Sequence, residues 1–127
     1  MAFNAADGSL VWRHETDGLV FGAPIVVGDV LYVGSSYMGP IPTDLTPDAF
    51  QVVFTGLRGT VYALNKADGN EIWSYPTGGA MYSSPAMANG VLYIGSMDSH
   101  VYAFGTAATQ PGLNIPLTYI IAAIAAI

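Results

Sequence analysis

The side chains able to perform acid–base or nucleophilic chemistry are few and scattered in this chain of 127 residues. His14 and His100 are the only histidines, and both stand at the ends of expected strands, where an edge position explains them better than a ligand role. The hydroxyls of Tyr82-Ser83-Ser84 have no neighbouring base in the sequence to activate them. These residues therefore predict no catalytic site and no metal site.

The carboxylates occupy positions that local turn and helix chemistry explains. Asp7, Asp29 and Asp68 each lie beside a glycine in an expected turn, where an aspartate caps backbone amides. Asp44 and Asp48 lie in one loop, and Thr46, Pro47 and Asp48 together are typical of a helix start. A calcium or substrate site in this loop is the alternative. No two titratable groups are spaced so as to push their pKa values apart.

Composition excludes several classes of function. The net charge is -6, and the three basic residues Arg13, Arg58 and Lys66 lie far apart in the sequence. Nucleic-acid binding needs clustered cations that displace counterions from phosphates, so no nucleic-acid partner is expected. The chain has no cysteine, which excludes disulfides, thiolate zinc sites and cysteine nucleophiles.

An internal repeat organises the chain. Residues 3–12 match residues 64–73, and the match continues for 33 residues at a constant offset of 61. A second alignment places Val61-Tyr62-Ala63-Leu64 on Val101-Tyr102-Ala103-Phe104 at an offset of 40, so the first repeat carries an insertion of 21 residues, at about 36–56. A period of 40 residues made of short β segments is typical of β-propeller blades, which have four strands each.

The repeat predicts an all-β fold, a partial β-propeller of about one and a half to two four-stranded antiparallel blades over residues 1–108. The complete blade should run from Ala23 to Tyr75, with strands at Pro24–Val27, Val30–Gly34, Thr60–Leu64 and Glu71–Tyr75. Before it we expect the end of a third strand (Ala2, Phe3) and an outer strand (Leu10–His14). After it we expect three strands and a hairpin turn at Asn89-Gly90.

The turns that precede the two tryptophans carry a family resemblance. Ala63, Asn65, Asp68, Gly69 and Trp73 resemble the tryptophan-docking motif of pyrroloquinoline-quinone (PQQ) dehydrogenase propellers, Ala-x-Asp-x-x-Thr-Gly-x-x-x-Trp. Asn replaces the usual Asp, and Asp replaces the usual Thr. The first repeat has the same pattern at Ala2, Asn4, Asp7, Gly8 and Trp12. The resemblance covers residues 2–106 and identifies the chain as similar to the PQQ-like repeat family.

The resemblance implies that each tryptophan stacks between neighbouring blades. An indole that buries ~150–250 Å² contributes roughly 4–6 kcal/mol before opposing terms. This is a structural docking role. We expect Trp12 to contribute less than Trp73, because Trp12 should pack where a neighbouring blade is absent.

Three functions are consistent with the resemblance. The first is a non-catalytic propeller module that binds a protein or polymer, with no cofactor. The second is the C-terminal part of a PQQ-dependent dehydrogenase, whose quinone and metal ligands and vicinal cysteines do not map onto residues here. The third is a scaffold in envelope protein assembly. In each, the remaining blades of a longer propeller would be partners, and association of copies into a ring is the alternative.

The C-terminal segment predicts a membrane anchor. Pro111-Gly112 ends the propeller pattern within a linker at 109–114, and Ile115 to Ile127 is an unbroken run of thirteen residues without charge. A membrane span needs roughly 20 apolar residues, so this stretch is expected to be the start of a transmembrane helix, cut short in a C-terminal fragment of a longer protein. The propeller would then face outside the cytoplasm. A buried core helix is the alternative.

Overall fold

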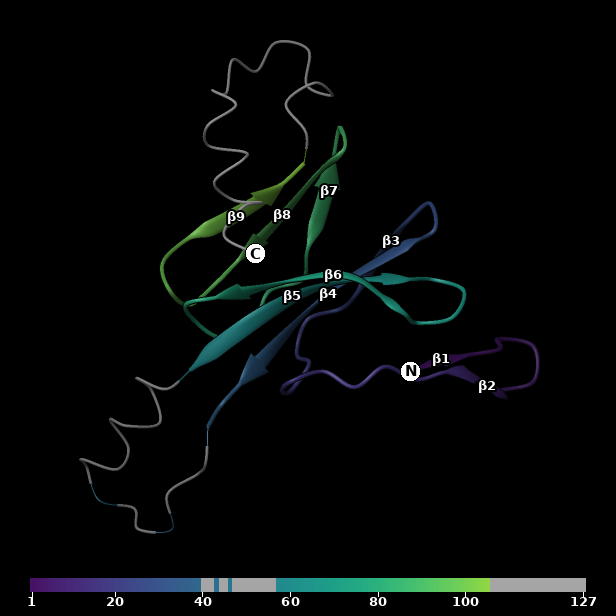
Figure 1. Cartoon of the computed structure of the whole chain (residues 1–127), viewed down its shortest axis with the longest axis horizontal. Coiled ribbons are helices and arrows are strands. Elements are labelled where there is room, and N and C mark those ends of the chain that lie inside the picture. The colour runs from purple at the N-terminus through teal and green to yellow at the C-terminus, as the bar shows by residue number, and fades with distance from the viewer. Residues whose placement is uncertain (40–42, 44–45, 47–56, 106–127) are drawn as a thin grey trace.

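Residues 1–39, 43, 46 and 57–105 are described by the computed structural model (Figure 1). Within these residues the chain forms antiparallel sheets of two, four and three strands. The strands are β1 (Ala2–Phe3), β2 (Leu10–Trp12), β3 (Ile25–Val27), β4 (Val30–Tyr37), β5 (Arg58–Asn65), β6 (Glu71–Thr77), β7 (Ala86–Ala88), β8 (Val91–Gly95) and β9 (Val101–Phe104). The described part holds no helix that could cross a membrane. The predicted linker at 109–114 and helix at 115–127 lie outside the described residues.

The all-β prediction and the strand order are confirmed. The complete blade is the sheet β3-β4-β5-β6, preceded by the pair β1-β2 and followed by β7-β8-β9. Strands β4 and β5 are longer than predicted and pair without a break from Val30↔Asn65 to Tyr37↔Arg58. The insertion therefore joins the ends of two fully paired strands. The outer strand β2 ends at Trp12, two residues earlier than predicted.

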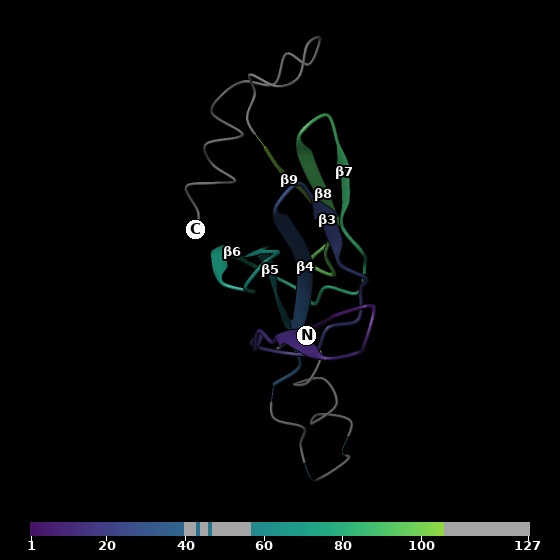
Figure 2. The same cartoon turned by 90° about the vertical axis from the view of Figure 1, so that its right-hand side faces the viewer.

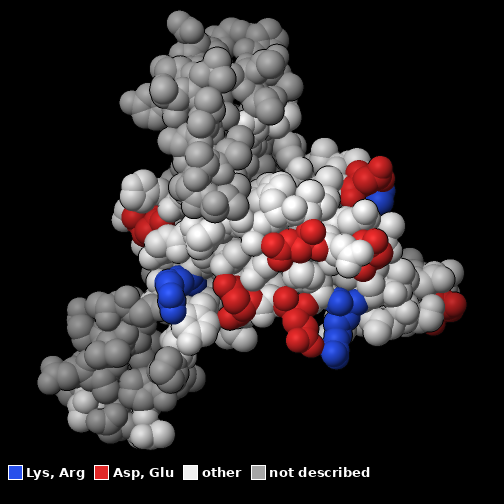
Figure 3. All heavy atoms as spheres, in the orientation of Figure 1, with Lys and Arg blue, Asp and Glu red and all other residues white. Residues whose placement is uncertain are grey.

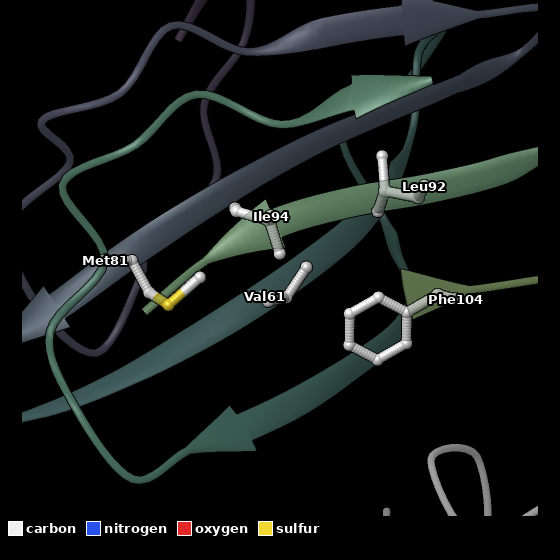
Figure 4. Close-up of a cluster of buried hydrophobic side chains, with 5 residues drawn as sticks. All are labelled: Val61, Met81, Leu92, Ile94 and Phe104. Atoms are coloured by element: carbon white, nitrogen blue, oxygen red, sulfur yellow. The ribbon is translucent and has the colours of Figure 1, made fainter. Parts of the chain in front are cut away.

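Strand β5 is buried on both of its faces, because successive side chains of a strand point to opposite sides of the sheet. Val61 faces the third sheet and packs in a core cluster with Leu92 and Ile94 of β8, Phe104 of β9 and Met81 (Figure 4). This cluster joins the four-stranded sheet to the three-stranded one.

The opposite face of β5 packs toward the two-stranded sheet. Tyr62 and Leu64 form a second cluster with Val33 of β4, and Trp12 of β2 and Leu31 pack against it. The central sheet is therefore covered on one face by β1-β2 and on the other by β7-β8-β9. The first strands of the two larger sheets, β3 and β7, are neighbours (Figure 2). Sheets stacked face to face in this way are blades of a propeller.

The joint between the second and third sheets generates a stability prediction. Leu92 is 1% exposed at the centre of the first cluster, so Leu92→Ala should lower the free energy of unfolding by about 2–5 kcal/mol. Met97→Ala, at a side chain that is 53% exposed, is the control and should change it by less than about 0.5 kcal/mol. Urea titration followed by circular dichroism measures both, and similar losses would contradict the assigned joint.

Candidate functional site

The two turns that carry the docking motif have the same hydrogen bonds. The side chains of Asn4 and Asn65 accept bonds from the amides two residues further on, at 3.0 and 2.8 Å. The side chains of Asp7 and Asp68 do the same, at 2.9 and 3.0 Å. The Asn and Asp that replace the family's Asp and Thr therefore stabilise the turn as Asx-type caps.

Trp12 lies against the turn of the following blade. Its indole Nε1 donates a hydrogen bond of 2.9 Å to the Lys66 carbonyl. Gly69 is buried beneath the ring, and a Cβ atom there would overlap the indole. The expectation that Trp12 lacks a neighbouring blade is wrong, because the following blade supplies its contacts.

Trp73 stands in the corresponding place one blade later. It pairs with Ala63 across β5 and β6, as Trp12 pairs with Ala2 across β1 and β2. Its ring lies 5.2 Å from that of Phe104, centroid to centroid, at an interplanar angle of 35°. Phe104 occupies the repeat position of Leu64, which packs near Trp12. Each tryptophan thus contacts the next sheet along the chain.

His14, predicted to be an edge residue, follows the end of the outer strand β2, is half-buried and belongs to the same joint. Its Nδ1 lies 3.0 Å from the Gly69 carbonyl, which only accepts, so Nδ1 carries the proton. The ring packs edge-on against Tyr62 at 5.6 Å, and Nε2 is buried without a hydrogen-bond partner. His14 and Trp12 therefore hold the same turn, at Gly69 and Lys66.

A polar network lies at the opposite ends of the strands. The carboxylate of Asp17 accepts hydrogen bonds from the hydroxyls of Ser35 on β4 and Thr60 on β5, the latter at 2.6 Å. The Asp17 amide donates to the Tyr62 hydroxyl at 3.1 Å. Burial alone would raise the pKa of Asp17, but the bonds from Ser35, Thr60 and Tyr62 outweigh burial and hold this pKa below its usual value. Asp17 thus ties the β2–β3 segment to the central sheet.

Asp98 makes the corresponding link between the second and third sheets. It accepts hydrogen bonds from the Tyr102 hydroxyl and from the Gly78 amide, the latter at 3.0 Å. Burial opposes ionisation, but these bonds and one from the His100 amide lower the pKa of Asp98. Burial, with the bond to Asp98, raises the pKa of Tyr102 to about 12. His100 lies in the turn before β9 and also contacts the Asp98 carboxylate, at 3.3 Å.

A pocket of about 310 Å³ opens beside the Asp17 network. Tyr37 and Arg58 form one part of its wall, and the Arg58 guanidinium lies 5.3 Å from the centre of the Tyr37 ring. These two residues are the last of β4 and the first of β5, and they pair directly. The rest of the wall is Asp17, Gly59, Thr60, Pro76 and Thr77. The pocket therefore brings a carboxylate and a guanidinium to one opening.

An aromatic pair is exposed between the sheets. Phe21 and Tyr82 are 61 positions apart, and their ring centroids lie 4.8 Å from each other. Phe21 is 50% exposed and Tyr82 is 45% exposed. The serines next to Tyr82 serve the backbone: Ser83 bonds to both the amide and the carbonyl of Gly95, and Ser84 accepts from the Ala23 amide.

The sequence singled out the docking motif but missed the pocket and the aspartate links. Tyr62 and Tyr102 occupy equivalent repeat positions, and this equivalence could have indicated that each tyrosine bonds an aspartate. Asp44 and Asp48 lie outside the described residues. Across the described ranges, no three metal-ligating side chains gather at one place.

Comparison with known proteins agrees with this geometry. A family model described as outer membrane protein assembly factor BamB matches residues 38–110. Tetrathionate hydrolase of Acidithiobacillus ferrooxidans is 31% identical over 118 residues, which is 85% of this chain and 22% of that protein. The crystal structure of BamB from Moraxella catarrhalis is similar with a TM-score of 0.53 at 13% identity, over 81% of this chain and 30% of that one. This chain thus spans less than a third of either relative.

The contact between Trp12 and Gly69 can be tested with a matched pair of variants. Gly8 has φ of 74° and Gly69 has φ of 73°, so Ala at either position adopts a left-handed backbone conformation. This should lower the free energy of unfolding by roughly 1–2 kcal/mol in both variants. Only at Gly69 does the new Cβ meet Trp12, since nothing lies within 4 Å of the one at Gly8. Gly69→Ala should therefore cost about 1–3 kcal/mol more in urea titrations. The excess should vanish in a Trp12→Ala background, and its persistence there would contradict the contact.

The Asp17 link predicts a specific pH dependence. The unfolded pKa is about 3.9 and the folded pKa is lower, so the carboxylate stabilises the fold fully above that value and loses this contribution as the pH falls through the folded pKa. Asp17→Asn should therefore be less stable than the unmodified chain at pH 7, and the gap should narrow below pH 4. Asp29→Asn, at a side chain that is 94% exposed, is the control. A gap that stays constant from pH 7 to pH 3 would contradict the link.

Proposed function

We infer the function of this chain from its family: it belongs to the PQQ-like β-propeller repeats described as outer membrane protein assembly factor BamB. Our proposal is that it is a non-catalytic binding module, part of a larger propeller that holds a protein or polymer partner. One such role is that of a scaffold in envelope protein assembly, and the name of the BamB family, an assembly factor, supports it.

The exposed aromatic pair is the observation that carries this proposal. Phe21 and Tyr82 present two adjacent rings at the surface, and Leu19 and Val20 beside them are also exposed. Aromatic side chains are enriched at the centres of protein interfaces, where they supply large contact area at small entropic cost. An apolar group of this kind supports a docking role for the segments that precede β3 and β7.

The surface charge supports a partner with a basic rim. Carboxylates outnumber cations, and they are spread over the face shown in Figure 3. Two of the three cations are already engaged, Arg13 with Glu15 at 3.1 Å and Lys66 with Asp29 at 3.4 Å. The resulting negative field attracts basic surfaces and repels phosphate backbones. A polypeptide partner therefore suits this surface better than nucleic acid.

We also propose that the module is tethered to the cell membrane and faces outside the cytoplasm. The support is sequence alone: residues 115–127 carry no charge, are mostly Ile, Leu and Ala, and could begin a transmembrane helix. Attaching a reporter to the C-terminal side of this segment in the whole protein, followed by membrane fractionation and protease protection, tests both parts. Recovery of the reporter in the soluble fraction would exclude the anchor.

A second candidate is that the chain is part of an enzyme. The similarity to tetrathionate hydrolase, which extends over 85% of the chain, favours this alternative. The other enzyme that the chain could be part of is a PQQ-dependent dehydrogenase. The full-length protein should be assayed for loss of tetrathionate, and for alcohol oxidation with added PQQ and calcium. Turnover above background in either assay would replace the non-catalytic proposal.

The binding proposal predicts the effect of removing the aromatic pair. The probe is reduced, carboxamidomethylated lysozyme, an unfolded polypeptide that keeps its basic charge because the blocking group is neutral, titrated against the chain by biolayer interferometry. Replacing both Phe21 and Tyr82 by Ser should weaken binding at least tenfold, which corresponds to ~1.4 kcal/mol, a modest value for two hot-spot side chains. Ile72→Ser, at a side chain of 53% exposure on β6, is the matched control and should stay within twofold. Equal affinity of the double variant and the unmodified chain would remove the basis of the proposal.

A further inference from the structure

Within the part of the chain that the structure describes, Arg58 is a cation without a carboxylate partner. Among the described residues it makes no ion pair within 4.0 Å, whereas Arg13 and Lys66 each make one. Its guanidinium lies over the ring of Tyr37 instead. A guanidinium held against an aromatic face keeps its N–H edge free for a planar anion such as a carboxylate.

The pocket beside Arg58 has few other free donors. The Thr60 hydroxyl donates to Asp17, and the Thr77 hydroxyl is bonded to the Gly79 carbonyl at 2.8 Å. Both threonines line the pocket, but their protons are engaged. Arg58 is therefore the main group in this wall that can bind an anion. At about 310 Å³ the pocket is near the lower end of the range for small-ligand sites.

Asp17 restricts which anion fits. Its carboxylate remains ionised at neutral pH and accepts bonds from the hydroxyls of Ser35, Thr60 and Tyr62, which leaves room for one further donor among its about four lone-pair sites. A fixed negative charge in the same pocket disfavours a dianion. It favours a ligand that presents a hydrogen-bond donor beside its own single negative charge.

We propose that this pocket binds the C-terminal residue of a polypeptide, with the terminal carboxylate on Arg58 and a backbone N–H directed to Asp17. Tyr37 and Pro76 provide apolar surface for the side chain of that residue. The inference rests on the proposed binding function and deepens it by naming the group of the partner that is recognised. A free amino acid shares this chemistry, and the polypeptide is favoured because it also fits the proposed binding function and because the Tyr37 and Arg58 side chains that border the pocket are both exposed.

The test measures fluorescence anisotropy of a fluorescein-labelled peptide, Gly-Gly-Ser-Gly-Gly-Phe, with the full chain. The peptide with a free C-terminus should bind at least tenfold tighter than its C-terminal amide. Arg58→Gln should remove this tenfold preference, and Arg13→Gln, which breaks an ion pair elsewhere, should keep it. Thermal melts followed by circular dichroism should be the same for both variants, because both side chains are exposed.

Equal binding of the acid and amide peptides, or an acid preference that Arg58→Gln leaves unchanged, would overturn the inference. So would sulfate that displaces the labelled peptide at a lower concentration than the unlabelled peptide does. Displacement by free phenylalanine as strong as by the unlabelled peptide would overturn it as well. The failure of this inference is distinguishable from that of the proposed function. The Phe21 and Tyr82 double variant tests binding of unfolded polypeptide in a chain whose Arg58 is unchanged, whereas the preference for acid over amide tests Arg58 in a chain whose aromatic pair is unchanged, so the two sites are read separately.

Discussion

Burial of strand β5 on both faces is the constraint on which the rest of the structure depends. Val61 faces the third sheet, while Tyr62 and Leu64 face the first. A sheet buried on both sides needs a neighbour on each side, and no single four-stranded sheet can supply that by itself. The repeat solves this by covering each sheet with the next one. Trp12 and Trp73 extend the same joints to the outer strands.

The two aspartate links, at Asp17 and Asp98, use the same kinds of hydrogen bond although the aspartates do not occupy equivalent positions in the repeat. At the first joint Asp17 comes from the segment before β3 and binds hydroxyls of β4 and β5. At the second joint the residue equivalent to Asp17 is Gly78, and the carboxylate is supplied by Asp98 from the β8–β9 turn. Each aspartate also bonds a tyrosine hydroxyl: the Asp17 amide donates to Tyr62, and the Asp98 carboxylate accepts from Tyr102. Strict repetition of sequence is therefore not needed for repetition of contacts.

The same strand ends carry the pocket proposed for recognition. Loops on a rigid scaffold commonly carry binding residues, but here Tyr37 and Arg58 are themselves paired members of the β4–β5 ladder. Their placement is set by backbone hydrogen bonds, and a site built on paired strands holds its geometry better than one built on a loop. The pocket and the exposed rings of Phe21 and Tyr82 are therefore borne by the framework that the blade joints stabilise.

The sequence by itself determined the strands, their antiparallel order and the turns at Asn65–Asn70 and Asn4–Ser9, because alternation of side chains and turn chemistry are local properties. It did not determine that Trp12 and His14 pack on Gly69, or that Arg58 and Asp17 line one pocket. Those contacts join residues more than 40 positions apart, and their geometry depends on how neighbouring sheets twist and stack. Only the tertiary structure decides that, because the energy of such a contact exists only when both sheets are in place.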